Sequence, residues 1–140
     1  MDCDLEFRSQ GFNTLIKEIL SKPVEEVDGG VLVSFDSNDP KYSYAEVNSV
    51  GLVERTAEKE VISYHALCGA YFFSSARSFL YAADCLMHKT NFSKPEYYVS
   101  LLYNYLLRRG EIVRLVKMEE YYSYGTPEEL NRYTQIGGNK

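Results

Sequence analysis

The chain lacks several features that mark whole classes of protein. It has no tryptophan and two histidines, and none of its three cysteines belongs to a C-x-x-C pair. Cys3, Cys68 and Cys85 therefore argue against a disulfide framework or a zinc ribbon and fit a reducing cytoplasm. The longest apolar runs, such as residues 66–73, fall far short of the roughly 20 residues that span a membrane. The first four residues, MDCD, include two aspartates where a signal peptide is basic. We therefore expect a cytoplasmic protein.

Length, composition and charge limit the number of domains, the class of protein and the partners it could bind. At 140 residues the chain has room for one domain, which we place at residues 1–136 with a flexible tail at 137–140. Its hydrophobic content of 45% and charged content of 25% exclude a disordered chain, a coiled coil and a collagen-like repeat. The net charge of −5 argues against broad binding to nucleic acid or to anionic membranes.

Apolar spacing and capping residues predict four helices. The first covers residues 12–20, where one stripe holds Phe12, Leu15, Ile16, Ile19 and Leu20. The second is capped by Ser74 or Ser75 and presents one face made of Ala76, Phe79, Leu80, Ala83 and Met87. The third groups Val99, Leu102, Tyr103 and Leu106 and ends at Gly110. Thr126 and Pro127 open a short fourth helix, whose first turn carries two glutamates.

Strand patterns occur at residues 31–35, 42–47, 52–58, 66–73 and 111–118. Residues 48–51 connect two of these strands as a hairpin, whereas residues 59–65 are too mixed to assign. Because helices alternate with strands, the chain is expected to have an α/β fold. The hairpin makes its sheet a mixed one.

Familiar catalytic motifs are missing. The sequence has no G-x-S-x-G, no H-E-x-x-H and no P-loop. His88 falls late in an amphipathic helix, where a surface position is the simplest interpretation. No serine or cysteine nucleophile scheme is supported, and we assign no catalytic residue.

Six segments nevertheless form an unusual ordered series. They are residues 2–5 (DCDL), 41–47 (KYSYAEV), 57–59 (AEK), 62–73 (ISYHALCGAYFF), 96–100 (EYYVS) and 123–130 (SYGTPEEL). In this order, over residues 2–133, the chain resembles the C-terminal half of the sugar-phosphate nucleotidyltransferases, the NDP-sugar pyrophosphorylase family. The resemblance implies part of a Rossmann-like, three-layer domain with a mixed sheet.

The resemblance also implies a reaction, in which a sugar 1-phosphate and an NTP give an NDP-sugar and pyrophosphate. In the family an aspartate at the position of Asp4 holds Mg²⁺, a hard ion that suits carboxylate oxygens. The alternative is that Asp4 only caps the loop before the first helix. Many relatives carry a second metal-binding aspartate where this chain has Ser123, which places a two-carboxylate site in question.

Five further residues match binding positions of the family. Glu58 would accept sugar hydroxyls, while the ammonium of Lys59 would approach the sugar phosphate. The alternative for this pair is an exposed ion pair at a strand end. Gly69 and Tyr71 would line the sugar side of the pocket, or merely pack the sheet. Lys94 stands where relatives place a phosphate-binding cation, although Pro95 replaces the usual glycine.

The family's G-x-G-x-R loop, which binds the nucleotide triphosphate, does not occur in this sequence. Three hypotheses remain open. The chain could be the sugar-phosphate-binding portion of a nucleotidyltransferase, inactive until a complementary half supplies the nucleotide site. It could be a non-catalytic remnant that binds a sugar phosphate or a protein partner. It could also be a small interaction module with a tyrosine-rich surface. An uncovered sheet edge would favour self-association or a complementary chain.

Overall fold

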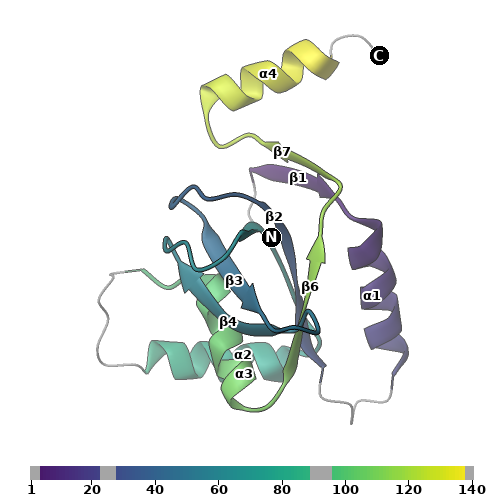
Figure 1. Ribbon diagram of the computed structural model, residues 1–140, viewed down its shortest axis with the longest axis vertical. Coiled ribbons are helices and arrows are strands. Elements are labelled where there is room, and N and C mark those ends of the chain that lie inside the picture. The colour runs from purple at the N-terminus through teal and green to yellow at the C-terminus, as the bar shows by residue number, and fades with distance from the viewer. Residues whose placement is uncertain (1–3, 23–27, 89–95, 138–140) are drawn as a thin grey trace.

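The computed structural model describes residues 4–22, 28–88 and 96–137, and from residue 133 onward only the helical backbone (Figure 1). Seven strands, four α-helices and one 3₁₀-helix occur in the described part of the chain. In chain order they are β1 (Leu5–Arg8), α1 (Gln10–Ser21), β2 (Asp28–Asp36), β3 (Ser43–Val47), β4 (Val53–Glu58), β5 (His65–Phe73), α2 (Ala76–Met87), η1 (Val99–Leu102), α3 (Tyr103–Arg108), β6 (Ile112–Lys117), β7 (Glu120–Ser123) and α4 (Pro127–Gly137). No helix among these residues is long and apolar enough to cross a membrane.

Five strands form a mixed sheet in the order β4-β3-β5-β2-β6. β2 runs parallel to β6 and antiparallel to β5, while β3 and β4 form the expected antiparallel hairpin. β3 meets β5 through the pair Tyr44 and Ala66. A separate antiparallel pair joins β1 to β7, with Leu5 opposite Ser123. The predicted mixed α/β sheet is therefore confirmed.

α1 covers one face of the sheet and α2 and α3 cover the other, which makes three layers, whereas α4 lies apart beyond β7 (Figure 1). α1 packs against β2 and β6, whereas α2 and α3 pack against β5 and β4 on the opposite face. Successive side chains of the central strand β2 point alternately to these two faces. Leu32 belongs to the larger core with α2 and α3, and its neighbour Val33 belongs to the smaller core on the other face. Both side chains are fully buried, as the two-residue period of a strand requires.

Two of the predicted helices differ from the observed ones. In α2 the buried face consists of Ser78, Ala82 and Leu86, and two members of the predicted apolar face, Leu80 and Met87, are 64% and 57% exposed. The prediction was wrong for Leu80 and Met87, because α2 approaches the sheet through the small side chains of Ser78 and Ala82. Of the predicted face, Ala83 packs against the larger core and Phe79 meets Phe73 edge to face. The third helix begins as a 3₁₀ turn, η1, and becomes α-helical at Tyr103.

Other differences concern short elements. β1 and β7 were not predicted, because each has only four residues and mixed polarity. Asp4 does not cap α1. The N-cap is Ser9, whose hydroxyl accepts a hydrogen bond from the Phe12 amide at 3.2 Å. α4 extends through Gly137, the first residue of the expected tail, and residues 138–140 lie outside the described part.

The outer strand β4 is joined to the helical segment by side-chain hydrogen bonds. The amide of Asn104 pairs with the backbone of Thr56 in both directions, at 2.8 and 2.9 Å. The Thr56 hydroxyl also donates to the Ser100 carbonyl at 2.7 Å. Asn104 thus satisfies the backbone N–H and carbonyl of Thr56, as a neighbouring strand would. These hydrogen bonds fix η1 and α3 against β4.

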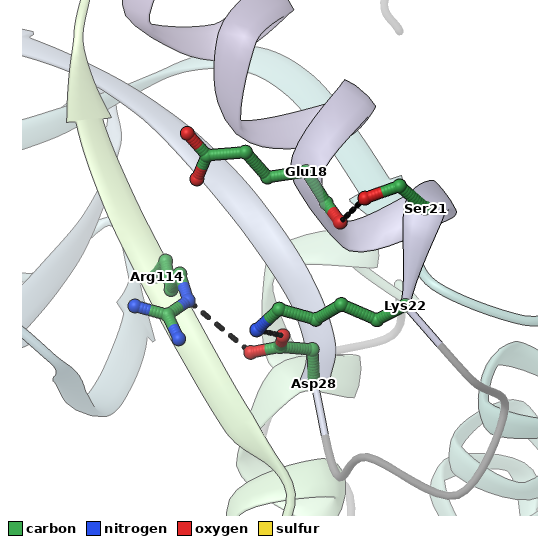
Figure 2. A network of polar contacts seen from close by, with 5 residues as sticks. All are labelled: Glu18, Ser21, Lys22, Asp28 and Arg114. Atoms are coloured by element: carbon green, nitrogen blue, oxygen red, sulfur yellow. Dashed lines mark hydrogen bonds and ion pairs between the residues drawn. The ribbon is translucent and has the colours of Figure 1, made fainter.

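Asp28, at the start of β2, lies between two cations (Figure 2). Its carboxylate is 3.2 Å from the Lys22 ammonium and 3.1 Å from the Arg114 guanidinium. The Asp28 side chain is only 6% exposed, whereas both cations are about a third exposed. Lys22 is the C-cap of α1 and Arg114 lies on β6, so one carboxylate joins the helix end to the two parallel strands.

Replacing this carboxylate tests its contribution. Asp28→Ala is expected to lower the free energy of unfolding by about 3 kcal/mol, because two cations lose a buried partner. Urea denaturation measures the loss. The matched control is Asp36→Ala, whose pair with Lys117 is about two-thirds exposed on both sides and is expected to contribute at most about 1 kcal/mol. Equal losses for the two variants would contradict the assignment.

Tyr103 makes stability sensitive to alkaline pH. The side chain is fully buried and its hydroxyl donates to the Phe72 carbonyl at 3.0 Å. Burial raises the pKa of Tyr103 far above its ordinary value of 10.0. Above pH 10 the unfolded chain therefore releases a proton that the folded chain keeps, and stability falls as the pH rises. In Tyr103→Phe, urea midpoints between pH 9 and 11 should decline less steeply than in the wild type. Parallel declines would refute this.

Candidate functional site

A cleft of about 490 Å³ lies where β1, β7 and the bulged part of β5 meet the ends of β3 and β4 and the start of η1. Its lining includes Asp4, Leu5, Lys41, Tyr42, Ser43, Glu58, Leu67, Cys68, Gly69, Tyr71, Tyr97, Tyr98, Val99, Tyr121 and Ser123. Four residues selected from the sequence, at positions 4, 58, 69 and 71, thus share one cleft although they are far apart along the chain. Ser123, at the expected second metal position, lies there too.

Asp4 enters the cleft from the β1–β7 pair. Its carbonyl accepts a hydrogen bond from the Tyr124 amide at 2.7 Å, which continues the ladder beyond Leu5 and Ser123. A Cβ added at Gly125 would lie 2.9 Å from Asp4 Oδ2. Glycine at this position therefore gives the carboxylate the space that it occupies.

Glu129 is a second carboxylate near Asp4. Its Oε2 accepts hydrogen bonds from the Ser123 hydroxyl at 3.0 Å and from the Thr126 amide at 3.1 Å. The Thr126 hydroxyl in turn accepts from the Glu129 amide, which completes a capping box at the start of α4. Glu129 Oε2 and Asp4 Oδ2 both lie within 4 Å of the Cβ position of Gly125.

Glu58 lines the cleft from the end of β4. Its Oε2 accepts hydrogen bonds from two hydroxyl groups, those of Ser43 on β3 and Ser100 on η1. Ser43 is also the register partner of Glu58 in the hairpin. The carboxylate is half-buried and reaches the cleft with one oxygen already oriented by hydroxyl donors.

Lys59 lies at the rim, beside the cleft rather than in its lining. Its backbone has a positive φ of 55°, which is uncommon for a residue with a side chain. The ammonium donates to the Tyr98 hydroxyl at 2.9 Å and lies over the Tyr98 ring, and that hydroxyl contacts Glu96. The hydrogen bond with Tyr98 raises the pKa of Lys59. The cation is therefore held next to a wall of the cleft.

Gly69 lies in a β-bulge. Between the pairs Leu32–Tyr71 and Ser34–Leu67, three residues of β5 face the single residue Val33. Gly69 has φ of +86°, a conformation that side chains disfavour. Glycine at this position thus allows the backbone of β5 to bulge where the strand lines the cleft. Tyr71 lines the cleft and also packs within the structure, since its ring centroid lies 6.2 Å from that of Tyr103.

Aromatic rings make much of the remaining wall. Five tyrosines line the cleft, and two of them contact Phe35 behind the surface. Phe35 stacks on Tyr121 at 5.1 Å and meets Tyr42 edge to face at 4.9 Å. Burial raises the pKa of Tyr121, which keeps its hydroxyl neutral. Rings with a few polar groups are typical of sites for small molecules.

Lys41 is a cation in the cleft lining that was not selected as a site residue from the sequence. Its ammonium lies 3.4 Å from Asp39 and 4.9 Å from the centroid of the Tyr42 ring. The hydrogen bond with Tyr42 raises the pKa of Lys41, so the group is charged at neutral pH. Lys41, Tyr42 and Ser43 belong to the segment 41–47 that carried the resemblance, and this signal could have identified them. Lys94 lies outside the described residues.

The described residues contain no cluster of three or more histidine, cysteine or acidic side chains that could hold a metal. Magnesium does not require one, because it is commonly bound through one or two carboxylates, waters and substrate phosphates. The exposed carboxylate of Asp4 fits that description, and the oxygen of Glu129 lies close by.

No protein-family model and no curated protein matches the sequence. Solved structures do match. The nucleoside-diphosphate-sugar pyrophosphorylase from Vibrio cholerae RC9 aligns with 94% of this chain and 53% of its own at a TM-score of 0.79 and 22% identity. A proposed glucose-1-phosphate thymidylyltransferase from Bacillus anthracis, solved in complex with sucrose, aligns with 98% and 52% at a TM-score of 0.68 and 19% identity.

The chain therefore has the fold of part of a sugar nucleotidyltransferase, as the resemblance implied. It spans about half the length of both solved structures.

The strained backbone of Lys59 gives a test at one position. Lys59→Gly and Lys59→Ala both remove the contact with Tyr98, but only glycine relieves the left-handed conformation. Because that conformation costs a residue with a Cβ about 1–2 kcal/mol, Lys59→Gly should be about 1 kcal/mol more stable than Lys59→Ala. Thermal and urea denaturation compare the two variants. Equal or reversed stability would contradict the strained conformation.

Proposed function

We propose that the cleft binds a sugar 1-phosphate and that the chain is the sugar-phosphate-binding portion of a cytoplasmic nucleotidyltransferase. One observation carries the proposal: Asp4, Glu58, Gly69 and Tyr71, selected by resemblance from distant segments, line a single cleft. The similarity of the fold to that of two sugar nucleotidyltransferases supports it.

The chemistry of the lining suits such a ligand. The Glu58 carboxylate would accept hydroxyl groups of the sugar, and tyrosine rings would cover its apolar faces. Lys41 in the wall and Lys59 at the rim would attract the phosphate as point charges. Asp4 would hold Mg²⁺, which would neutralise phosphate charge when bound.

In the complete reaction a phosphate oxygen of the sugar 1-phosphate attacks the α-phosphorus of an NTP. The new P–O bond forms as the bond to the leaving pyrophosphate breaks. The residues of this chain would bind and orient the sugar phosphate. The sequence holds no G-x-G-x-R loop for the triphosphate, so we propose that a complementary half supplies the nucleotide site.

Titration with α-D-glucose 1-phosphate tests the binding site. Isothermal calorimetry should detect binding to the wild-type chain, and Glu58→Gln should weaken it about 10-fold or more, because a charge-assisted hydrogen bond contributes roughly 1.5–3 kcal/mol. The matched control is Glu46→Gln, which removes an exposed carboxylate of β3 paired with Arg55 and should leave the affinity unchanged. Absence of binding to this and other sugar 1-phosphates would refute the proposal.

Pyrophosphate release tests the need for a second half. With Mg²⁺, a sugar 1-phosphate and each of the four common NTPs, the chain alone is expected to release no measurable pyrophosphate, because it lacks the triphosphate loop. A coupled colorimetric assay measures the release, and an authentic pyrophosphorylase is the positive control. Clear turnover by this chain alone would show that its own residues bind the nucleotide.

A further inference from the structure

Two serine hydroxyls from different elements converge on the same carboxylate oxygen. Ser43 Oγ and Ser100 Oγ both donate to Glu58 Oε2, the latter at 2.9 Å. Ser43 precedes Glu58 by 15 residues and Ser100 follows it by 42. The three side chains meet only because β3, β4 and η1 come together at this end of the sheet.

Each serine is itself held in place. Ser100 is fully buried, and its carbonyl accepts the Thr56 hydroxyl at 2.7 Å. Asn104 fixes the backbone of Thr56 from the same helical segment. Ser43 lies directly opposite Glu58 in the β3–β4 ladder. Neither donor depends on a mobile side chain for its position, since a serine has a single rotatable bond before its hydroxyl group.

We propose that Ser43 and Ser100 are positioning residues, which set the orientation of the Glu58 carboxylate in the cleft before a ligand binds. The inference rests on the proposed function, because it concerns the same site. Two donors on one oxygen select a rotamer and a carboxylate plane, so less conformational freedom is lost when sugar hydroxyls bind. Removing either donor should weaken sugar-phosphate binding without removing the group that touches the ligand.

Affinity for α-D-glucose 1-phosphate is the first readout. Ser43→Ala and Ser100→Ala should each weaken binding about 3- to 10-fold, the range expected when one rotamer-rich side chain must be ordered on binding. Ser43→Thr keeps the hydroxyl on a strand that favours a β-branched residue, and it should bind as the wild type does. If Ser43→Thr binds as the wild type does, the loss in Ser43→Ala is due to the missing hydroxyl group and not to the changed shape of the side chain.

The matched control is Ser63→Ala. Ser63 also donates its hydroxyl to β3, at 2.6 Å from the Ala45 carbonyl, but it is not part of the cleft lining. Its loss should lower stability and leave affinity unchanged. If the wild type binds and Ser43→Ala and Ser100→Ala bind with the same affinity as the wild type, the positioning inference is wrong while the proposed function stands.

A second readout needs no ligand. The side-chain carboxyl carbon of Glu58, followed by ¹³C NMR at neutral pH, should shift by more than its linewidth in Ser43→Ala and Ser100→Ala but not in Ser63→Ala. This measurement tests the positioning role even if the wild-type chain binds no sugar phosphate. Absence of such binding would refute the proposed function only. An unmoved Glu58 resonance in both Ser43→Ala and Ser100→Ala would overturn the positioning role. Ser43→Ala alone suffices if Ser100→Ala does not fold.

Discussion

The burial of β2 on both faces is the constraint on which the other elements depend. Leu32 and Val33 point into different cores, so a shift of one residue would exchange the contents of both. The register of β2 therefore fixes β6 on one side and β5 on the other. Since the bulge at Gly69 interrupts the β2–β5 ladder, the position of the cleft wall follows from the same register.

The second constraint is the attachment of η1 and α3 to β4. Asn104 and Thr56 make this attachment with hydrogen bonds between side chains and backbone, so its geometry does not depend on exposed charges. It brings the buried Ser100 to the end of β4, where Glu58 meets it. Stability and site geometry are thus linked here, because the interactions that protect the outer strand also set the carboxylate.

Two carboxylates and two lysines lie in or beside the cleft. The carboxylates of Asp4 and Glu58 line the cleft from different elements, while Lys41 lies in the wall and Lys59 beside it. Five tyrosines line the same cleft. A carboxylate acceptor with cations beside it agrees with the proposed sugar 1-phosphate ligand, and the fold is shared with two solved sugar nucleotidyltransferase structures over about half their length.

The sequence by itself determined the α/β class, the hairpin and the start of α4, because each depends on local periodicity or on a cap. It also determined the stripe of α1 except for Leu20, which is 65% exposed. Its ordered motifs also singled out Asp4 and Glu58. Only the tertiary structure decided that small side chains turn α2 toward the sheet, that Lys41 lines the cleft, and that Ser43 and Ser100 share one oxygen of Glu58. The reason is that such contacts join residues from separate elements, whose packing no local pattern records.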